Sequence, residues 1–293
     1  MTDIISDVSM VQTLCNPGEG KKIEEFYNHT DGERFDTVKN FYFQQHVQQT
    51  YDFAISKMKK YEDMDKLVLD PWSALELGGS FTDDSDPDTE LDQIYHSFQV
   101  AEALRKLYPD EEKYGWLHLT GLIHDLGKIL TPAFGEPQWC NVGDTFPVGC
   151  MFERVGVFPE YFDYNPDLKH PVYSTKLGIY EPKCGLNNLI MSFSHDEYLY
   201  KVLTHEKNTS QFTEKKLPIQ SYYMIRYHSF FPWHKFEAYT CFENEIDKEN
   251  KHWVQIFASF DLYSKAHDIV DIESVKSYYQ NLMKQYLPAK IYF

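Results

Sequence analysis

The feature that most constrains the fold is an apolar periodicity of three and four residues that recurs along most of the chain. Between residues 33 and about 64, for example, Val47, Ala54 and Met58 fall on one stripe. This spacing places side chains on one face of a helix, so it predicts α-helices rather than strands. Asp70-Pro71 looks like a helix cap followed by a first-turn proline. The other predicted helices span Leu91–Leu107, Glu112–Leu130, Leu186–Leu203, Ile219–Phe230, Asn250–Lys265 and Ile272–Tyr286. We therefore expect an all-α fold.

Four of these apolar stripes contain an imidazole or a carboxylate. His96 shares a face with Val100 and Leu107, and His195 shares one with Met191. The other two stripes contain His124 and Asp261. A buried carboxylate or unpaired imidazole is costly unless it is paired or bound to a metal. One such residue could be an ordinary core hydrogen bonder, but four in different helices predict a shared polar centre.

The adjacent pair His124-Asp125 indicates what this centre binds. An imidazole offers one neutral nitrogen, whereas a carboxylate has two oxygens and can bridge two cations. The dipeptide is a weak signal alone, because it recurs at His195-Asp196 and His267-Asp268. Together with histidines on other helices it predicts a dinuclear metal site.

The remaining histidines carry less information. His228 has an apolar setting near a helix end, and its sequence context leaves a core role and a ligand role equally open. We interpret the others as structural or solvent-facing: His29, His46, His118, His170, His205, His234, His252 and His267.

Two loops and the N-terminal segment lie outside the predicted helices and bear on the domain organisation. An acidic stretch spans residues 82–88 and by composition resembles a solvated linker, while a Gly- and Pro-rich stretch of about 55 residues follows Leu130. Loops of that length inside a compact domain are often functional. We predict an irregular N-terminal segment, residues 1–32, that could act as a lid, and one helical domain over 33–293.

Composition narrows the classes of partner. The net charge of -17 disfavours nucleic acid and anionic membranes. No apolar stretch reaches the roughly 18 residues of a membrane span. The five cysteines are widely spaced without a C-x-x-C motif, which is typical of reduced thiols. We expect a cytoplasmic monomer.

The order of the candidate ligands along the chain resembles the HD-domain superfamily: His96, His124-Asp125, His195, His228 and Asp261. The segments around these residues resemble the myo-inositol oxygenase family. The resemblance runs from about residue 26 to near the C-terminus. Its segments are Ser85–Asp88, Leu122–Lys128, Gly135–Trp139, Gly143–Cys150, Asn165–Leu168, Tyr173–Thr175, His195–Tyr200, Met224–His234 and Phe260–Tyr263.

The resemblance implies an HD-domain-like helical bundle around two iron ions, and an enzyme that uses O2 to cleave the ring of myo-inositol to D-glucuronate. One iron would be bound by His96, His124 and Asp261, and the other by His195 and His228. Asp125 would bridge them, and the active form would be mixed-valent Fe(II)/Fe(III). Four imidazoles with two carboxylates suit iron better than magnesium, which prefers oxygen ligands.

The resemblance also implies which residues contact the substrate. Lys128 and Asp125 would take part in catalysis, and the substrate contacts would be Asp83, Lys128, Asp144, Ser229 and Lys265. From spacing alone, Lys128 and Lys265 would be read as surface lysines. The sequence departs from the family where Tyr27 stands in place of the usual arginine, and residues 203–216 look like a surface insertion.

Two other classes of function are alternatives to the oxygenase. An HD-type phosphohydrolase would also use two metals, but it would need basic groups for phosphate, for which only Lys128, Lys265 and Arg226 are candidates. A catalytically inactive helical scaffold is disfavoured because every ligand position is intact.

Overall fold

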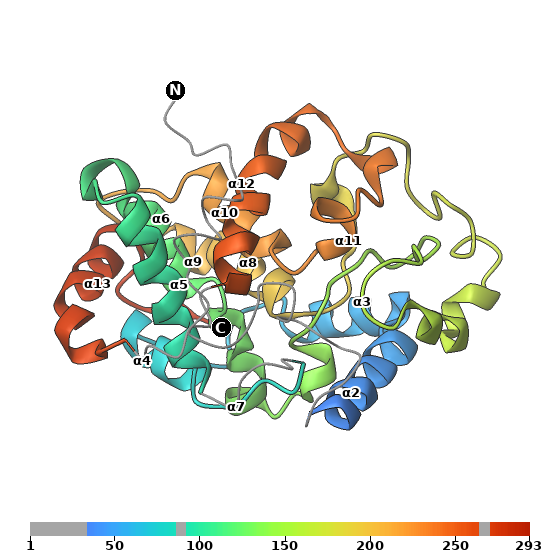
Figure 1. The fold of residues 1–293 in the computed structure, drawn as a ribbon, viewed down its shortest axis with the longest axis horizontal. Helices are drawn as coiled ribbons and strands as arrows, with labels where there is room; N and C mark the ends of the chain where they lie inside the picture. Colours follow the sequence, from blue (N-terminus) through green and yellow to red (C-terminus); the bar gives the residue numbers. More distant parts are fainter. Residues whose placement is uncertain (1–33, 86–91, 264–269) are drawn as a thin grey trace.

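Helices and the turns that connect them make up the structure, a computed structural model that describes residues 34–85, 92–263 and 270–293. The all-α prediction is confirmed, and Figure 1 shows the helices packed around a common centre. The α-helices are α2 (Phe35–Gln48), α3 (Tyr51–Lys60), α4 (Pro71–Gly78), α5 (Gln93–Leu107), α6 (Glu111–Ile123), α7 (Leu130–Phe134), α8 (His195–Thr204), α9 (Glu206–Thr209), α10 (Ile219–Tyr227), α11 (Phe231–His234), α12 (Glu245–Tyr263) and α13 (Ile272–Tyr286).

Short elements join these helices. Two strands, β1 (Val68–Leu69) and β2 (Ile291–Tyr292), pair antiparallel and attach the C-terminus to the loop before α4. The 3-10 helices are η2 (Leu126–Ile129), η3 (Gln138–Cys140), η4 (Pro159–Tyr164), η5 (Pro166–Lys169), η6 (Leu186–Asn188) and η7 (Thr240–Phe242). None of the helices in the described ranges is both long enough and apolar enough to span a membrane.

Local signals explain several helix boundaries. The helix predicted over residues 33–64 is divided into α2 and α3, because the side chain of Thr50 caps a new helix by accepting from Phe53 N. Asp70 caps α4 in the same way and Pro71 occupies its first turn, as predicted. The predicted helix over 112–130 is interrupted after Ile123, where the chain continues into η2.

One predicted helix is wrong in its first half. Residues 186–188 form η6, Met191 pairs with Pro147 in an isolated β-bridge, and α8 begins only at His195. The stripe from Met191 to His195 is therefore not a helical face. Its apolar members are buried because this extended segment crosses the core, and burial from extended structure can mimic helical spacing over a few residues.

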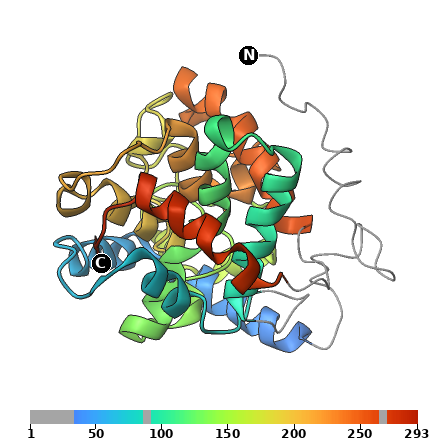
Figure 2. The same cartoon turned by 90° about the vertical axis from the view of Figure 1, so that its left-hand side faces the viewer.

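Close helix packing brings the polar residues together. A Cβ at Gly121 in α6 would lie 2.8 Å from Leu104 Cδ1 and 3.0 Å from Ala101 Cα, so only glycine permits the observed approach of α5. Helix α10 packs against both α8 and α12. Figure 2 shows α13 lying across the face that also carries α5 and α6. The centre of the molecule thus receives residues from α5, α6, α8, α10 and α12.

Candidate metal centre

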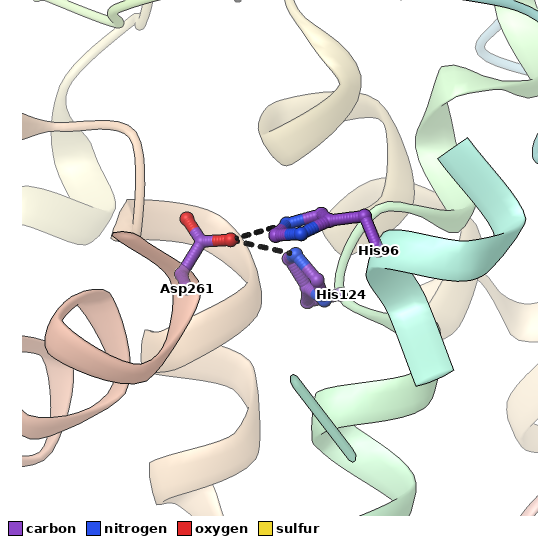
Figure 3. Close-up of side chains that lie close together, drawn as sticks. All are labelled: His96, His124 and Asp261. Atoms are coloured by element: carbon purple, nitrogen blue, oxygen red, sulfur yellow. Dashed lines mark hydrogen bonds and ion pairs between the residues drawn. The ribbon is translucent and has the colours of Figure 1, made fainter. Parts of the chain in front are cut away.

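The first group of candidate ligands is formed by three helices that are distant in sequence. His96 on α5 and Asp261 on α12 approach within 2.7 Å between Nε2 and Oδ1. His124, directly after α6, places its Nε2 3.3 Å from the same oxygen. Figure 3 shows the two imidazoles converging on the carboxylate. These three buried residues could bind one metal ion.

A second group lies on the other side of Asp125. His195 begins α8 and His228 directly follows α10, and their Nε2 atoms are 3.2 Å apart. Asp196 Oδ1 is 2.7 Å from His195 Nε2 and 3.5 Å from His228 Nε2. His195, Asp196 and His228 are all buried and could bind a second ion.

The carboxylate of Asp125 lies between the two groups. Its Oδ2 is 3.4 Å from His124 Nε2, whereas its Oδ1 is 3.2 Å from His195 Nε2 and 3.6 Å from His228 Nε2. One oxygen therefore faces each group, which is the arrangement that a bridging carboxylate requires.

The orientation of the rings fits a metal. Nδ1 of His124 is 2.8 Å from Gly121 O, and Nδ1 of His195 is 2.5 Å from Asn141 O. Nδ1 of His228 lies 3.1 Å from the carbonyls of Met224 and Ile225. Because each Nδ1 donates to the backbone, each Nε2 faces the centre, as in metal-bound histidines. His124 Nε2 is buried and has no hydrogen bond of good geometry within the described ranges.

A glycine permits the approach of the two groups. A Cβ at Gly127 in η2 would collide with the backbone carbonyl of His195. Asn141 is fixed in turn, because its side-chain nitrogen donates to Lys128 O at 2.9 Å. The chain just after Asp125 therefore lies directly against the start of α8.

The charges of the centre favour a cation. Burial disfavours protonated His124, but the carboxylates of Asp125 and Asp261 outweigh burial and raise its pKa to about 10. Burial also opposes the charge on His195, yet Asp196 and Asp125 raise its pKa to about 9. A bound metal ion would supply the positive charge that these buried carboxylates favour.

A narrow polar cavity adjoins the ligands and contains Lys128. This side chain is only 6% exposed, and its Nζ lies 2.9 Å from both Asp83 Oδ2 and Asp125 Oδ2 and 2.8 Å from Gln93 Oε1. Burial alone would lower the pKa of Lys128, but Asp125 and Asp83 raise it, so the amine stays protonated. The surface-lysine interpretation is wrong because η2 turns this residue inward.

The acidic loop is not a solvated linker where it is described. Asp83 is buried, and its Oδ1 accepts from Ser85 N at 2.8 Å. Gln138, in the Gly- and Pro-rich stretch, donates to Thr82 O at 3.0 Å and accepts from Asp84 N at 2.8 Å. The two loops therefore support each other next to Asp83, which lines the cavity.

Two further candidate contacts line the same cavity. Asp144 is buried beside Tyr42, whose hydroxyl donates to Oδ1 at 3.3 Å, and burial raises the pKa of Asp144 to about 7. Ser229 follows His228 and also lines the cavity. Lys265 and Tyr27 lie outside the described residues, as does the N-terminal segment 1–32.

Comparison with known proteins identifies the family. A family model described as "Myo-inositol oxygenase" matches residues 35–293. The chain belongs to the myo-inositol oxygenase family. A protein from Oryza sativa named "Probable inositol oxygenase" is 49% identical over 89% of this chain and 82% of its own length. "Inositol oxygenase" from Dictyostelium discoideum is 46% identical over 93% and 91%, and the protein of that name from Mus musculus is 42% identical over 99% and 98%.

In this member of the myo-inositol oxygenase family, residues that the sequence patterns do not single out also surround the ligands. Asp196, which the sequence marks only as part of a common His-Asp dipeptide, is 1% exposed and contacts both His195 and His228. His234, which the sequence leaves as structural or solvent-facing, is buried and has its Nε2 2.9 Å from His228 O. Arg34 Nη2 donates to Asp83 O at 3.0 Å. The adjacency of Asp196 to a candidate ligand was the one available signal, and no spacing rule indicated the other two.

Proposed function

We propose that this chain is an inositol oxygenase that binds two iron ions and uses O2 to convert myo-inositol to D-glucuronate. The observation that carries the proposal is the convergence of four imidazoles and two carboxylates around Asp125, in a chain of this family. The proposed ligands are His96, His124, Asp261, His195 and His228, with Asp125 as the bridge.

The donor set supports iron. Magnesium and calcium prefer shells made of oxygen, whereas imidazole nitrogen with carboxylate oxygen suits iron and its first-row neighbours. When bound, a mixed-valent Fe(II)/Fe(III) pair would supply the activation of O2 and the redox capacity for the oxidation. In the overall balance one oxygen atom of O2 enters glucuronate and the other leaves as water.

The cavity supports a polyhydroxylated substrate. Asp83 and Asp144 offer hydrogen-bond acceptors, while protonated Lys128 and the hydroxyl of Ser229 offer donors. Donors and acceptors together can bind the hydroxyls of a neutral ring, and Lys128 would stabilise negative charge on a hydroxyl oxygen next to Asp125. Lys265 stays a predicted contact, as do a cytoplasmic location and a monomeric state.

A phosphohydrolase is less well supported. Lys128 is the one lysine or arginine among the described residues that line the cavity, and it already contacts two carboxylates. Arg226 donates through Nε to Glu197 Oε2 at 2.7 Å and does not line the cavity. Apart from the metal ions themselves, a phosphoester would therefore meet more carboxylates than lysine or arginine side chains in the cavity.

The deciding experiment combines metal analysis with turnover. The full chain is purified anaerobically with iron, and its iron content, O2 uptake and glucuronate formation with myo-inositol are measured. We expect two irons per chain and one glucuronate formed for each O2 consumed. Full iron loading without either activity would exclude the oxygenase, and nucleotide hydrolysis with manganese would support the phosphohydrolase.

A further inference from the structure

Gln93 lines the cavity beside Lys128 but is not among the substrate contacts proposed above. It is the first residue of α5 and is 3% exposed. Its Oε1 accepts from Lys128 Nζ at 2.8 Å. Because an ammonium group can only donate, this contact identifies which atom of the amide is the oxygen. The other atom, Nε2, has no acceptor among the described residues, so it can donate to a molecule in the cavity.

The main chain holds Gln93 in place. Gln93 N donates to Phe81 O at 3.1 Å, and Ile94 N donates to Gly79 O at 3.1 Å. A Cβ at Gly79 would lie 2.6 Å from Ile94 Cβ, so only glycine lets the start of α5 pack this closely. His96 follows Gln93 by three residues and shares its helical face. The amide of Gln93 is therefore presented to the cavity from a fixed backbone.

The contacts of Lys128 bring a substrate oxygen close to this amide. Its ammonium group has three hydrogens and three acceptors, which are Asp83 Oδ2 and Asp125 Oδ2 at 2.9 Å and Gln93 Oε1 at 2.8 Å. A substrate hydroxyl can accept from Lys128 only if it displaces or shares one of these acceptors. The hydrogen bonds to the carboxylates are stronger because both partners are charged, so Gln93 is the partner that is displaced most easily. The hydroxyl would then lie next to the Gln93 amide.

We propose that Gln93 is a further substrate-binding residue, whose Nε2 donates to one hydroxyl of the inositol ring. It is the one side-chain amide among the described residues that line the cavity. A ring isomer in which this hydroxyl is inverted would leave the amide without its acceptor, and an unpaired polar group in a binding site disfavours the wrong substrate. Gln93 thus contributes to the preference among inositol isomers. This inference rests on the proposed function.

Binding measurements with deoxy analogues test the role of Gln93. The iron-loaded full chain is titrated anaerobically, by calorimetry, with myo-inositol and with analogues that each lack one of its hydroxyls. Gln93→Met should bind myo-inositol about three- to tenfold more weakly than wild type. It should bind one deoxy analogue as tightly as myo-inositol, because the hydroxyl that this analogue lacks no longer has a partner. Gln48→Met, which replaces an exposed glutamine of α2, is the control and should match wild type.

The outcomes separate this role from the proposed function. A wild-type chain that does not bind myo-inositol would overturn the proposed function, and the role of Gln93 with it. If wild type binds myo-inositol, unchanged affinities in Gln93→Met, or equal weakening of every analogue, would overturn the role of Gln93 alone.

A second variant covers the case in which Gln93→Met does not fold. Gln93→Glu retains an acceptor for Lys128 and loses the N–H donor. It should change the discrimination at one hydroxyl and leave the others as in wild type. A change of equal size across all the analogues would overturn the proposal.

Discussion

The two halves of the centre have similar donors but are built differently. The half with His96, His124 and Asp261 is assembled from α5, the end of α6 and α12, so it depends on the packing of helices that are distant in sequence. The half with His195 and Asp196 takes both residues from the first turn of α8, and His228 joins them from the end of α10.

This difference has a consequence for how each half is stabilised. The first half needs the glycine at position 121, which lets α5 approach α6. The second half needs Gly127, which lets η2 approach the start of α8. Asp125 lies between these two glycines in sequence and between the two halves in space. A centre built in this way should lose one ion at a time when either half is altered, and both ions when Asp125 is altered.

The largest effect is expected for Asp125→Ala, which removes the one side chain that faces both halves. We expect this variant to retain almost no iron, because each ion loses an oxygen ligand and the shared negative charge. Metal analysis after desalting measures the effect. Asp92→Ala, an exposed aspartate whose side chain does not cap α5, serves as the control and should retain two irons. If Asp125→Ala kept two irons, the bridging assignment would be wrong.

Asp261→Asn should weaken metal binding in one half of the centre and leave the other half unchanged. This carboxylate contacts only His96 and His124 among the candidate ligands, so its loss should reduce the iron content from about two to about one per chain. Ion-by-ion binding constants from anaerobic titration would show which ion is lost. Weakening of both ions to the same extent would contradict independent halves.

Lys128→Met should lower the turnover of myo-inositol more than it lowers the binding of iron. Its Nζ contacts Asp83 and Asp125, so its removal should lower kcat/KM for myo-inositol about 10- to 100-fold, the range for a hydrogen bond to a charged group. Both irons should remain. Steady-state O2 uptake measures the effect, and thermal unfolding reports the cost of leaving Asp83 unpaired. Lys106→Met, an exposed residue on α5, is the control. Unchanged kinetics would remove Lys128 from the site.

The smallest expected effect is that of Asp144 on the pH dependence of the free energy of unfolding. Its folded-state pKa is raised by burial to about 7 from an ordinary value of 3.8, so the folded state binds more protons than the unfolded state between these values. The free energy of unfolding of the metal-free chain should therefore decrease as pH rises from about 4 to about 7, by at most about 1.4 kcal/mol per pH unit. Chemical denaturation across this range should show a smaller decrease for Asp144→Asn. Equal slopes would contradict a raised pKa.

The helices and most of the candidate ligands could be predicted from sequence because their signals are local. The stripes through His96 and Asp261 are helical faces that point toward the core, and Asp70-Pro71 marks a real helix start. The stripe that singles out His195 is only partly helical, since His195 is the first residue of α8 and Met191 precedes the helix in extended structure. The single-domain boundary at residues 33–293 stays a prediction.

Periodicity and the His-Asp pair by themselves determined that this chain is helical and that polar ligands face its core. Tertiary structure alone decided that Lys128 points inward, that Asp83 is buried, and that Asp196 lies against two imidazoles. The physical reason is the separation along the chain of the residues on which each feature depends. Helical faces depend on neighbours three and four residues apart, whereas the position of a charge in a cavity depends on glycine contacts and loops that meet only when the chain is folded.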